Sequence, residues 1–351
     1  MTPVRLVIAE DTLSMQAILQ QIFTPDQGFE LLALCNNGRE LIEAVARNRP
    51  DVIITDLDMP VMDGVTAIQT LRQRWPDIPI LVFSNSFILH RSRGSLSAAD
   101  VGATDILFKP PSVSRQSLPQ IAGLLRERVR AAASARPVPA TTRPKGPAQA
   151  SEADVAPLLR RWPRIDYIAI GTSTGGPQTL RTVLGRLPKL FRQTVLVTQH
   201  MDAAFMLQFA DWLDTQIAPR VRIPGQGERL RPAHVYVAPG DVHMTVEQDT
   251  IRLSSAPPEH SCRPAADPLF RSLIPHARHT CALVLTGIGQ DGALGLKQLR
   301  EAGALTLAQD EDSSVVWGMP GTAVRLGAAE AVWSDHALAG FLETLTTRKE
   351  D

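Results

Sequence analysis

Residues 165–176, IDYIAIGTSTGG, place a serine where nucleophilic chemistry is possible. Residues 165–170 are apolar apart from Asp166, which is typical of a buried strand in a parallel sheet. The strand pattern breaks at Gly171, and a helical pattern opens at Pro177. A strand, a glycine turn and a helix hold a serine hydroxyl at the carboxyl edge of a sheet, beside helix amides that stabilise an oxyanion.

The five residues Gly171, Thr172, Ser173, Thr174 and Gly175 fit the G-x-S-x-G pattern of a nucleophile elbow. They fit equally well a glycine-rich turn that binds a phosphate or a nucleotide. This stretch alone does not separate the two interpretations. A nucleophilic Ser173 requires a base and an acid from elsewhere in the chain.

A base and an acid follow two later strand-like runs. His200 ends the run 194–200, and Asp291 follows the run 281–289. In a serine triad the imidazole takes the serine proton and the carboxylate orients the imidazole. Structural roles are also open, because His200 fits a half-buried strand exit and Asp291 is a good N-cap for the next helix. The order Ser, His, Asp differs from that of the α/β-hydrolases.

A second set of polar side chains follows strand-like runs in the first 130 residues: Glu10, Asp11, Asp56, Ser84 and Lys109. Three carboxylates at one sheet edge repel one another unless a cation joins them, and oxygen ligands suit Mg²⁺. With the metal bound, Asp56 could attack phosphorus, Lys109 could pair with the phosphate, and the Ser84 hydroxyl could bond it. Taken singly, Asp11 could cap a helix and Lys109-Pro110 could be a loop.

Two successions of strand and helix patterns position these residues. In the first half, helical patterns, one of them over residues 89–99, alternate with five apolar runs: 4–10, 29–35, 51–56, 79–85 and 104–109. In the second half, helical patterns over 203–217, 267–277 and 292–303 separate runs at 165–171, 194–200, 234–240, 281–289 and 304–309. This alternation predicts two doubly wound parallel sheets, which bind ligands at the carboxyl ends of their strands.

Two segments break the rhythm. Residues 243–255 alternate around Gln248-Asp249 and predict an antiparallel hairpin. Residues 131–163 are rich in Ala and Pro, which predicts an extended linker whose last turns, near residue 155 onward, dock on a domain. We therefore expect domains at 1–130 and 164–351, joined by a linker at 131–163.

Composition narrows the class of protein. The net charge is zero with 21% charged residues, which argues against a nucleic-acid partner, and a compact helix-turn-helix pattern is missing as well. No apolar run is long enough to span a membrane and no signal-peptide pattern opens the chain, so we expect a cytoplasmic protein without direct membrane insertion. Cys35, Cys262 and Cys281 form neither a disulfide framework nor a zinc pattern.

Four further histidines carry weaker signals. His276 and His279 have i,i+3 spacing but lack a third ligand type nearby in the sequence, so we predict no metal site there. His243 and His260 are candidates for lining a cleft, and their roles stay open.

The first half resembles the receiver domains of response regulators, on the strength of Glu10-Asp11, residues 51–64 (DVIITDLDMPVMDG), Ser84 and residues 107–110 (LFKP). The resemblance implies a flavodoxin-like, five-stranded parallel fold in which Asp56 accepts a phosphoryl group from a histidine kinase. Glu10, Asp11, Asp56 and the backbone carbonyl of Asp58 would bind Mg²⁺. Ser84 and Lys109 would contact the phosphoryl group. Asp105-Ile106 stands where relatives often carry an aromatic switch residue.

The second half resembles the catalytic domain of chemotaxis protein-glutamate methylesterases. The segments that carry this resemblance are GTSTGGP (171–177), TQHM (198–201), VAPGDVHM (237–244), RPAADPLFRS (263–272), TGIGQDGALGL (286–296) and AQDEDSSVVWGMP (308–320). The resemblance implies Ser173 as nucleophile, His200 as base and Asp291 as orienting acid. Thr172, Thr174, Ile288 and Gly289 would form the oxyanion and substrate loop. Ile288 replaces a common Met, and Ala265-Ala266 replaces a common Ser-Val.

The two resemblances together imply a phosphorylation-regulated serine esterase with a doubly wound, mainly parallel catalytic domain. It would remove methyl groups from glutamate methyl esters of methyl-accepting chemoreceptors during chemotaxis adaptation, and would also deamidate receptor glutamines. A chemotaxis histidine kinase would donate the phosphoryl group. Mg²⁺ would serve the receiver domain, and ester hydrolysis would need no cofactor. The alternative is an inactive esterase fold that binds receptors under the control of phosphorylation.

Overall fold

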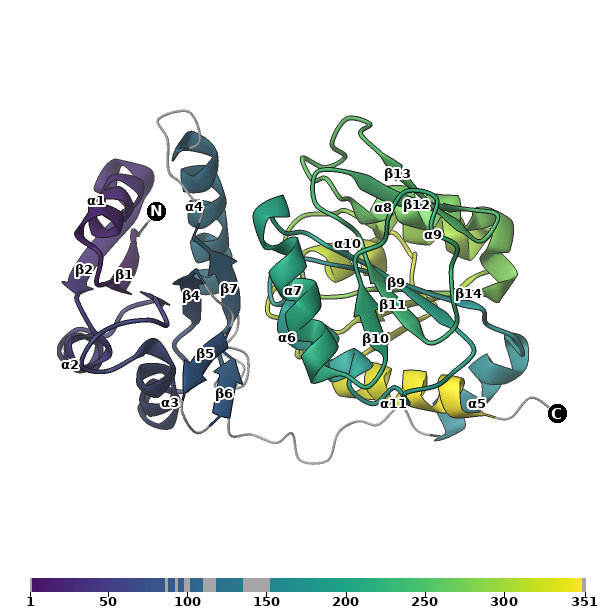
Figure 1. Cartoon of the computed structure of the whole chain (residues 1–351), viewed down its shortest axis with the longest axis horizontal. Coiled ribbons are helices and arrows are strands. Elements are labelled where there is room, and N and C mark those ends of the chain that lie inside the picture. The colour runs from purple at the N-terminus through teal and green to yellow at the C-terminus, as the bar shows by residue number, and fades with distance from the viewer. Residues whose placement is uncertain are drawn as a thin grey trace. The chain divides into compact units, whose positions relative to one another are not determined.

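The computed structural model describes residues 2–85, 88–91, 94–97, 102–109, 118–134 and 152–348. Contacts within the chain divide it into two compact units, residues 1–142 and residues 143–351. Each unit is built on one parallel sheet with helices against it (Figure 1). Both sheets confirm the fold predicted from the alternating strand and helix patterns.

The first unit has a five-stranded sheet in the order β2-β1-β3-β4-β7, with every neighbouring pair parallel. Its strands are β1 (Val4–Ala9), β2 (Phe29–Cys35), β3 (Val52–Thr55), β4 (Ile80–Ser84) and β7 (Asp105–Phe108). Its helices are α1 (Leu13–Ile22), α2 (Gly38–Arg47), α3 (Gly64–Arg74) and α4 (Leu118–Ser134), with a short 3₁₀ turn at Pro25–Gln27. This order is that of the flavodoxin-like sheet.

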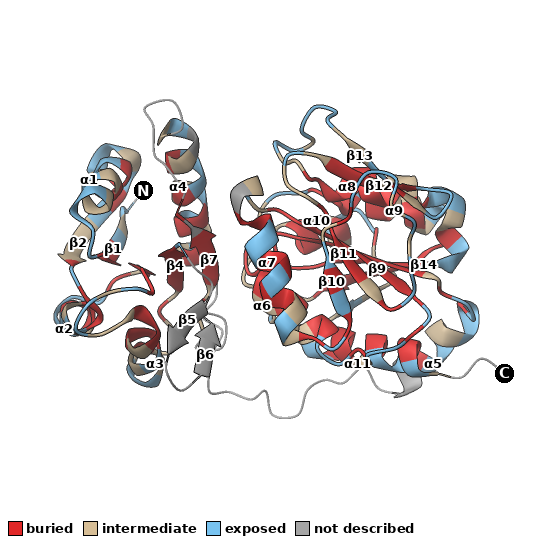
Figure 2. Cartoon of the chain, viewed as in Figure 1, coloured by how far each residue is buried: buried red, intermediate tan, exposed pale blue. Residues whose placement is uncertain are grey.

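Alternate residues of the central strands fill two cores. Leu6 and Ile8 of β1 pack in one cluster with residues of α1 and α4, such as Leu19 and Val129. The intervening strand residues point to the opposite face, where α2 and α3 contact each other. Because both faces are covered, the central strands β3 and β4 are buried throughout, and Figure 2 shows β4 in red, whereas the edge strand β2 is mostly half-buried.

One predicted helix of the first unit is wrong. Residues 89–99 were expected to be helical, but two short strands, β5 (Ile88–Arg91) and β6 (Gly94–Ser97), pair there in an antiparallel hairpin. Gly94, Ser95 and Ser97 are weak helix formers that lie within the expected helix, so its intrinsic preference is low. The pattern of leucine and serine alone did not separate the two structures.

The second unit has a seven-stranded parallel sheet in the order β10-β11-β9-β8-β14-β15-β16. Its strands are β8 (Tyr167–Thr172), β9 (Thr194–Gln199), β10 (Arg220–Arg222), β11 (His234–Val237), β14 (Thr280–Val284), β15 (Leu305–Gln309) and β16 (Ala331–Trp333). The five inner strands were predicted, and the three-residue edge strands β10 and β16 were not. The chain leaves β8 toward β9 and returns to β14 on its other side, so a topological switch point lies beside β8.

Helices cover both faces of this sheet. The helices are α6 (Gly176–Leu184), α7 (Ala203–Gln216), α8 (Ala266–Ser272), α9 (Ala293–Glu301), α10 (Met319–Arg325) and α11 (Asp335–Thr347), with a 3₁₀ segment at Ile274–His279. Helix α6 contacts α7 and α11, whereas α9 contacts α8 and α10. The predicted hairpin is confirmed as β12 (His243–Glu247) and β13 (Thr250–Ser254), and Gln248 and Asp249 form its turn with positive φ.

The segment expected to be an extended linker contains helix. Helix α4 continues to Ser134, and α5 (Glu152–Arg161) lies in the second unit, whereas residues 135–151 are outside the described residues. The end of α5 is fastened by Trp162, whose indole donates to the carbonyl of Gly303, and by Arg348, which donates to the carbonyl of Leu159. These contacts stabilise a helix that its Ala and Pro content did not indicate.

Candidate functional site

Ser173 lies directly after β8, the central strand of the second sheet. Its amide donates to the carbonyl of Thr286 at 3.0 Å, which ties the serine to the loop after β14. Gly175 then turns the chain into α6 with φ 76°, a left-handed conformation that glycine adopts without a steric penalty. Gly287 approaches so closely that a Cβ there would lie 2.7 Å from the Cβ of Ser173. The strand-turn-helix arrangement expected around Ser173 is therefore present.

His200 and Asp291 come to the same sheet edge from the two neighbouring strands. Thr172 pairs with Gln199 in the parallel register of β8 and β9, so the next residues, Ser173 and His200, leave adjacent strands side by side. The His200 Nε2 atom lies 2.7 Å from Asp291 Oδ2. All three side chains are buried.

His200 and Asp291 each stabilise the charged form of the other. Burial alone would lower the pKa of His200, but the hydrogen bonds with Asp291 and Cys262 outweigh it and raise the pKa to about 9. Burial would raise the pKa of Asp291, but His200 and the amides of Ala266 and Asp267 outweigh it and lower the pKa below its ordinary value. Asp291 is therefore a carboxylate that orients the imidazole through Nε2, and Nδ1 is the ring nitrogen on the other side.

Gln199, which no motif in the sequence marks as a site residue, bonds the backbone of both Ser173 and His200. Its buried side-chain amide donates to the carbonyl of Ser173 at 2.9 Å and to the carbonyl of His200 at 3.0 Å. A Cβ at Gly176 would lie 2.0 Å from Gln199 Oε1 and 2.7 Å from Thr172 Oγ1, so a larger residue there would displace the Gln199 amide. The only signal in the sequence was a polar residue at the end of an apolar strand.

We expect Gln199→Leu to lower kcat by about 10- to 100-fold, because the two residues that must meet lose their common backbone clamp. The rate of the expected ester hydrolysis under saturating substrate checks this, together with a thermal unfolding curve. Gln193→Leu is the matched control, since Gln193 is buried just before the opposite end of β9. Equal losses of activity in both variants would show that Gln199 acts only through general stability.

The four residues expected in the oxyanion and substrate loop lie around Ser173. Thr172 donates its hydroxyl to the carbonyl of Thr286 at 2.9 Å, and the carbonyl of Thr174 accepts the hydroxyl of Thr286 at 2.9 Å. These bonds fix the Ser173 turn against the loop after β14. Ile288 is half-buried and Gly289 is exposed with φ 88°, next to the close approach of Gly287. The loop therefore presents its backbone near the serine from the side of β14.

The carboxylates of the first unit gather at the carboxyl edge of its sheet. Asp56 follows β3, Glu10 follows β1, and Lys109 follows β7. Lys109 Nζ pairs with Asp56 Oδ2 and lies 2.7 Å from Glu10 Oε2, and all three side chains are buried. Burial lowers the pKa of Lys109, but Asp56 and Glu10 outweigh it, so the pKa is raised and the amine stays charged.

This cluster fits a divalent cation and a phosphoryl group. Oxygen atoms of Glu10, Asp11 and Asp56 lie within 4.8 Å of one another, and hard oxygen donors are those that Mg²⁺ prefers. Asp58 is exposed at the same edge, and its amide donates to Asp56 Oδ1 at 3.3 Å. The buried Ser84 hydroxyl has no hydrogen-bond partner among the described residues. An incoming phosphate oxygen would satisfy it.

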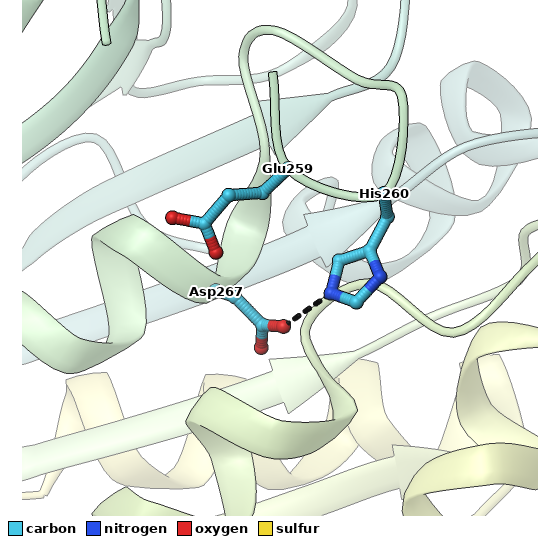
Figure 3. A group of neighbouring side chains, drawn as sticks. All are labelled: Glu259, His260 and Asp267. Atoms are coloured by element: carbon cyan, nitrogen blue, oxygen red, sulfur yellow. Dashed lines mark hydrogen bonds and ion pairs between the residues drawn. The ribbon is translucent and has the colours of Figure 1, made fainter. Parts of the chain in front are cut away.

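The remaining histidines have other surroundings. His276 packs its ring against Tyr167, and His279 lies 3.9 Å from Asp166. His243 Nδ1 accepts the amide of Ala265 at 3.2 Å. His260 lies 2.8 Å from Asp267 (Figure 3), and the amide of Asp267 donates to Asp291 Oδ1 at 3.0 Å.

Two family models match the two units of the chain. A model described as CheB methylesterase matches residues 168–342, and a model of the response regulator receiver domain matches residues 6–121. The first range contains Ser173, His200 and Asp291, and the second contains Asp56. The two families correspond to those that the motifs resemble.

Curated relatives match over nearly the full length. A protein-glutamate methylesterase/protein-glutamine glutaminase of Geobacter metallireducens is 36% identical over 349 residues, 99% of this chain and 100% of the relative. A protein of the same name from Nitrosospira multiformis is 36% identical over 99% of this chain and 98% of its own. The crystal structure of the Thermotoga maritima CheB methylesterase catalytic domain is 31% identical, with a TM-score of 0.50, and covers 52% of this chain and 99% of that one.

Proposed function

The chain belongs to the CheB methylesterase family and carries a receiver domain, and from that premise we propose that Ser173, His200 and Asp291 catalyse its reaction. The protein is a protein-glutamate methylesterase and protein-glutamine glutaminase of chemotaxis. The observation that carries the assignment of the residues is the 2.7 Å bond between His200 and Asp291 at the strand edge where Ser173 emerges. The relatives carry the names of enzymes, so the inactive binding module has no support from them.

The reaction begins with the Ser173 hydroxyl. Nδ1 of His200 takes its proton as Oγ attacks the ester carbonyl of a methylated glutamate, and Asp291 stabilises the imidazolium through Nε2. The imidazolium then protonates the leaving methoxide, and methanol departs. Water hydrolyses the acyl-enzyme by the same proton path. With a glutamine amide as substrate, ammonia leaves in place of methanol.

Backbone amides are the donors for the developing oxyanion. The α6 N-terminus begins at Gly176, three residues after Ser173, and the loop with Ile288 and Gly289 follows Gly287, whose backbone approaches the Ser173 side chain. Amides of Thr174, Ile288 and Gly289 would face the negative oxygen there, where fixed donors are worth several kcal/mol. The Thr172 hydroxyl would hold the turn in place.

Residues 1–130 regulate this reaction in our proposal, with residues 131–163 as the connection to the catalytic residues 164–351. Asp56 accepts the phosphoryl group from a chemotaxis histidine kinase, and Glu10, Asp11, Asp56 and the Asp58 carbonyl would hold Mg²⁺. The cation, when bound, neutralises the charge of the incoming phosphoryl group. Lys109 and Ser84 then contact the phosphoryl oxygens, and the change in their contacts biases the receiver toward its active state.

The substrate in this proposal is the cytoplasmic part of methyl-accepting chemoreceptors. No helix among the described residues is long and apolar enough to cross a membrane. In this proposal the enzyme meets its substrate at the receptor surface without inserting into the bilayer.

Release of methanol from membranes that contain methylated receptors tests the proposal, measured with and without a small phosphodonor and Mg²⁺. We expect the donor to accelerate the wild type and to leave Asp56→Asn at its basal rate, since the amide cannot accept the phosphoryl group. Asp51→Asn is the control, because Asp51 is paired with Arg5 at the opposite end of β3. Stimulation that persists in Asp56→Asn would place the phosphorylation elsewhere.

The dependence of the rate on pH offers a second test. His200 accepts a proton only when it is neutral, and its pKa is raised to about 9, so kcat/KM is expected to rise from about pH 7 toward about pH 9. Cys262→Ala removes one of the contacts that raise this pKa and should move the rise to lower pH. Ser173→Ala, measured in parallel, gives at each pH the rate that remains without the serine nucleophile. A flat profile across this range would contradict His200 as the base.

A further inference from the structure

A tight turn holds Cys262 beside the catalytic histidine. Glu259 and Cys262 exchange two backbone hydrogen bonds, with N···O distances of 3.2 and 2.8 Å, and the two residues between them, His260 and Ser261, have φ of 51° and 62°. Both central residues with positive φ define a type I′ turn, which side chains other than glycine and asparagine rarely adopt. Contacts from neighbouring elements must therefore hold this turn.

Side-chain contacts provide that support. Glu259 pairs with Arg271 at 2.5 Å, and His260 Nε2 lies 2.8 Å from Asp267 Oδ2; Figure 3 shows the imidazole and the carboxylate pointing toward each other. Glu259, His260 and Asp267 also have the composition of a metal site. However, Glu259 is occupied by Arg271 and Asp267 Oδ1 by the amide of Gly295, so we interpret the three as anchors of the turn.

Cys262 makes the contact that these anchors fix. Its Sγ lies 3.4 Å from His200 Nδ1, the nitrogen opposite the one bound to Asp291. The thiol is thus in contact with Nδ1, the nitrogen that takes the proton of Ser173 in the proposed mechanism. Cys262 is half-exposed, whereas Cys35 and Cys281 are buried. A partly exposed thiol beside an imidazole that can hold its proton is the arrangement found at reactive cysteines.

We propose that Cys262 is a peroxide-sensitive modification site that reversibly shuts off the esterase. The thiol proton moves to His200 Nδ1, and the sulfur attacks one oxygen of hydrogen peroxide. An S–O bond forms as the O–O bond breaks, so sulfur loses two electrons and the peroxide gains them. The leaving hydroxide takes the proton from the imidazolium and departs as water. The resulting sulfenic acid stays against Nδ1 and blocks proton transfer from Ser173, until a thiol reductant restores Cys262.

The reactivity of Cys262 depends only on the geometry above, whereas the loss of activity also rests on the proposed role of His200. Two readouts on the full chain separate them. The first is mass spectrometric detection of a dimedone adduct on the peptide that contains Cys262, after brief exposure to hydrogen peroxide. The second is release of methanol from methylated receptor membranes before and after addition of dithiothreitol.

We expect Cys262 to be labelled before Cys35 and Cys281. In His200→Gln, labelling of Cys262 should be slower by a factor of about ten or more. His336→Gln, a substitution on the exposed start of α11, is the matched control and should label like the wild type. Release of methanol should fall in step with labelling and recover with dithiothreitol, and the activity that Cys262→Ser retains should resist peroxide.

Equal labelling in His200→Gln and the wild type, or equal inactivation of Cys262→Ser and the wild type, would overturn the proposal. If Cys262 labels in a manner that depends on His200 while no sample releases methanol, the reactive thiol is supported. The failure then lies with the proposed function.

Discussion

Ser173→Ala is expected to lower the release of methanol by at least about 10³-fold, because alanine leaves only water to attack the ester. The remaining activity would come from the oxyanion donors and from substrate binding, which the substitution leaves intact. KM should therefore change little. The measurement is the initial rate of methanol release from methylated receptor membranes at saturating enzyme phosphorylation, so that regulation does not mask the chemical step.

A buried serine in the same unit controls for the loss of a hydroxyl. Ser314 is buried, donates to the carbonyl of Asp310 at 2.6 Å in the loop after β15, and has no part in the proposed proton path. Ser314→Ala should lose one hydrogen bond, worth about 1 kcal/mol of stability, and should keep most of its activity. More than a tenth of wild-type activity in Ser173→Ala would exclude this serine as the nucleophile.

The catalytic candidates could be predicted because they follow strands. Ser173, His200 and Asp291 each come directly after an apolar run or its loop, and parallel strands bring their carboxyl ends to one edge. The same reasoning located Glu10, Asp56 and Lys109, and their side chains meet in the first unit. A strand pattern predicts the edge of the sheet at which each residue lies. For these residues, knowing that edge was enough to propose the chemistry.

Contacts that depend on the direction of a side chain could not be predicted. Gln199 ends β9 one residue before His200, but nothing in the sequence shows that its amide turns back to two backbone carbonyls. Cys262 is 62 residues from His200 and reaches it through a turn whose positive φ values occur at His260 and Ser261, where glycine or asparagine would have signalled the turn. These contacts come from tertiary packing alone.

Elements were missed for two different reasons. The edge strands β10 and β16 have three residues each, too few to show an alternating period. Helix α11 was missed despite a readable signal, since Ser334 caps it by accepting the amide of Ala337 and Asp335 follows in its first turn. The prediction of a helix at residues 89–99 was wrong because it relied on the spacing of apolar residues and gave too little weight to the weak helix preference of glycine and serine.

Asp291→Asn is expected to lower kcat by about 10³- to 10⁴-fold with little change in KM, through the tautomer of His200. Four N–H donors converge on this carboxylate: His200 Nε2 and the amide of Ala266 on Oδ2, and the amides of Asp267 and Gly292 on Oδ1. Asparagine replaces one of the two carboxylate oxygens by an NH₂ group, which donates hydrogen bonds and cannot accept them. Its NH₂ group must therefore face one of these pairs.

The choice between the two orientations decides the chemistry. An NH₂ facing Asp267 and Gly292 would leave two buried backbone amides without an acceptor, at about 1–3 kcal/mol each. An NH₂ facing His200 and Ala266 leaves only one backbone amide, that of Ala266, without an acceptor. The imidazole adapts, because it can move its proton to Nδ1 and accept through Nε2. The second orientation is thus favoured, and it places a proton on the nitrogen that must receive one from Ser173. His200 is then the tautomer that already carries a proton on Nδ1, so it cannot accept the serine proton there.

Asp267→Asn separates this effect from the loss of a buried charge. Asp267 is equally buried, accepts the amide of Gly295 at 2.6 Å and pairs with His260, which takes no part in the proposed proton path. It should cost stability and less than about tenfold in kcat. Comparable losses of kcat in the two variants would mean that both aspartates act by holding the loops. A large loss confined to Asp291→Asn, without a matching fall in unfolding temperature, requires that the carboxylate itself sets which nitrogen of His200 accepts the serine proton.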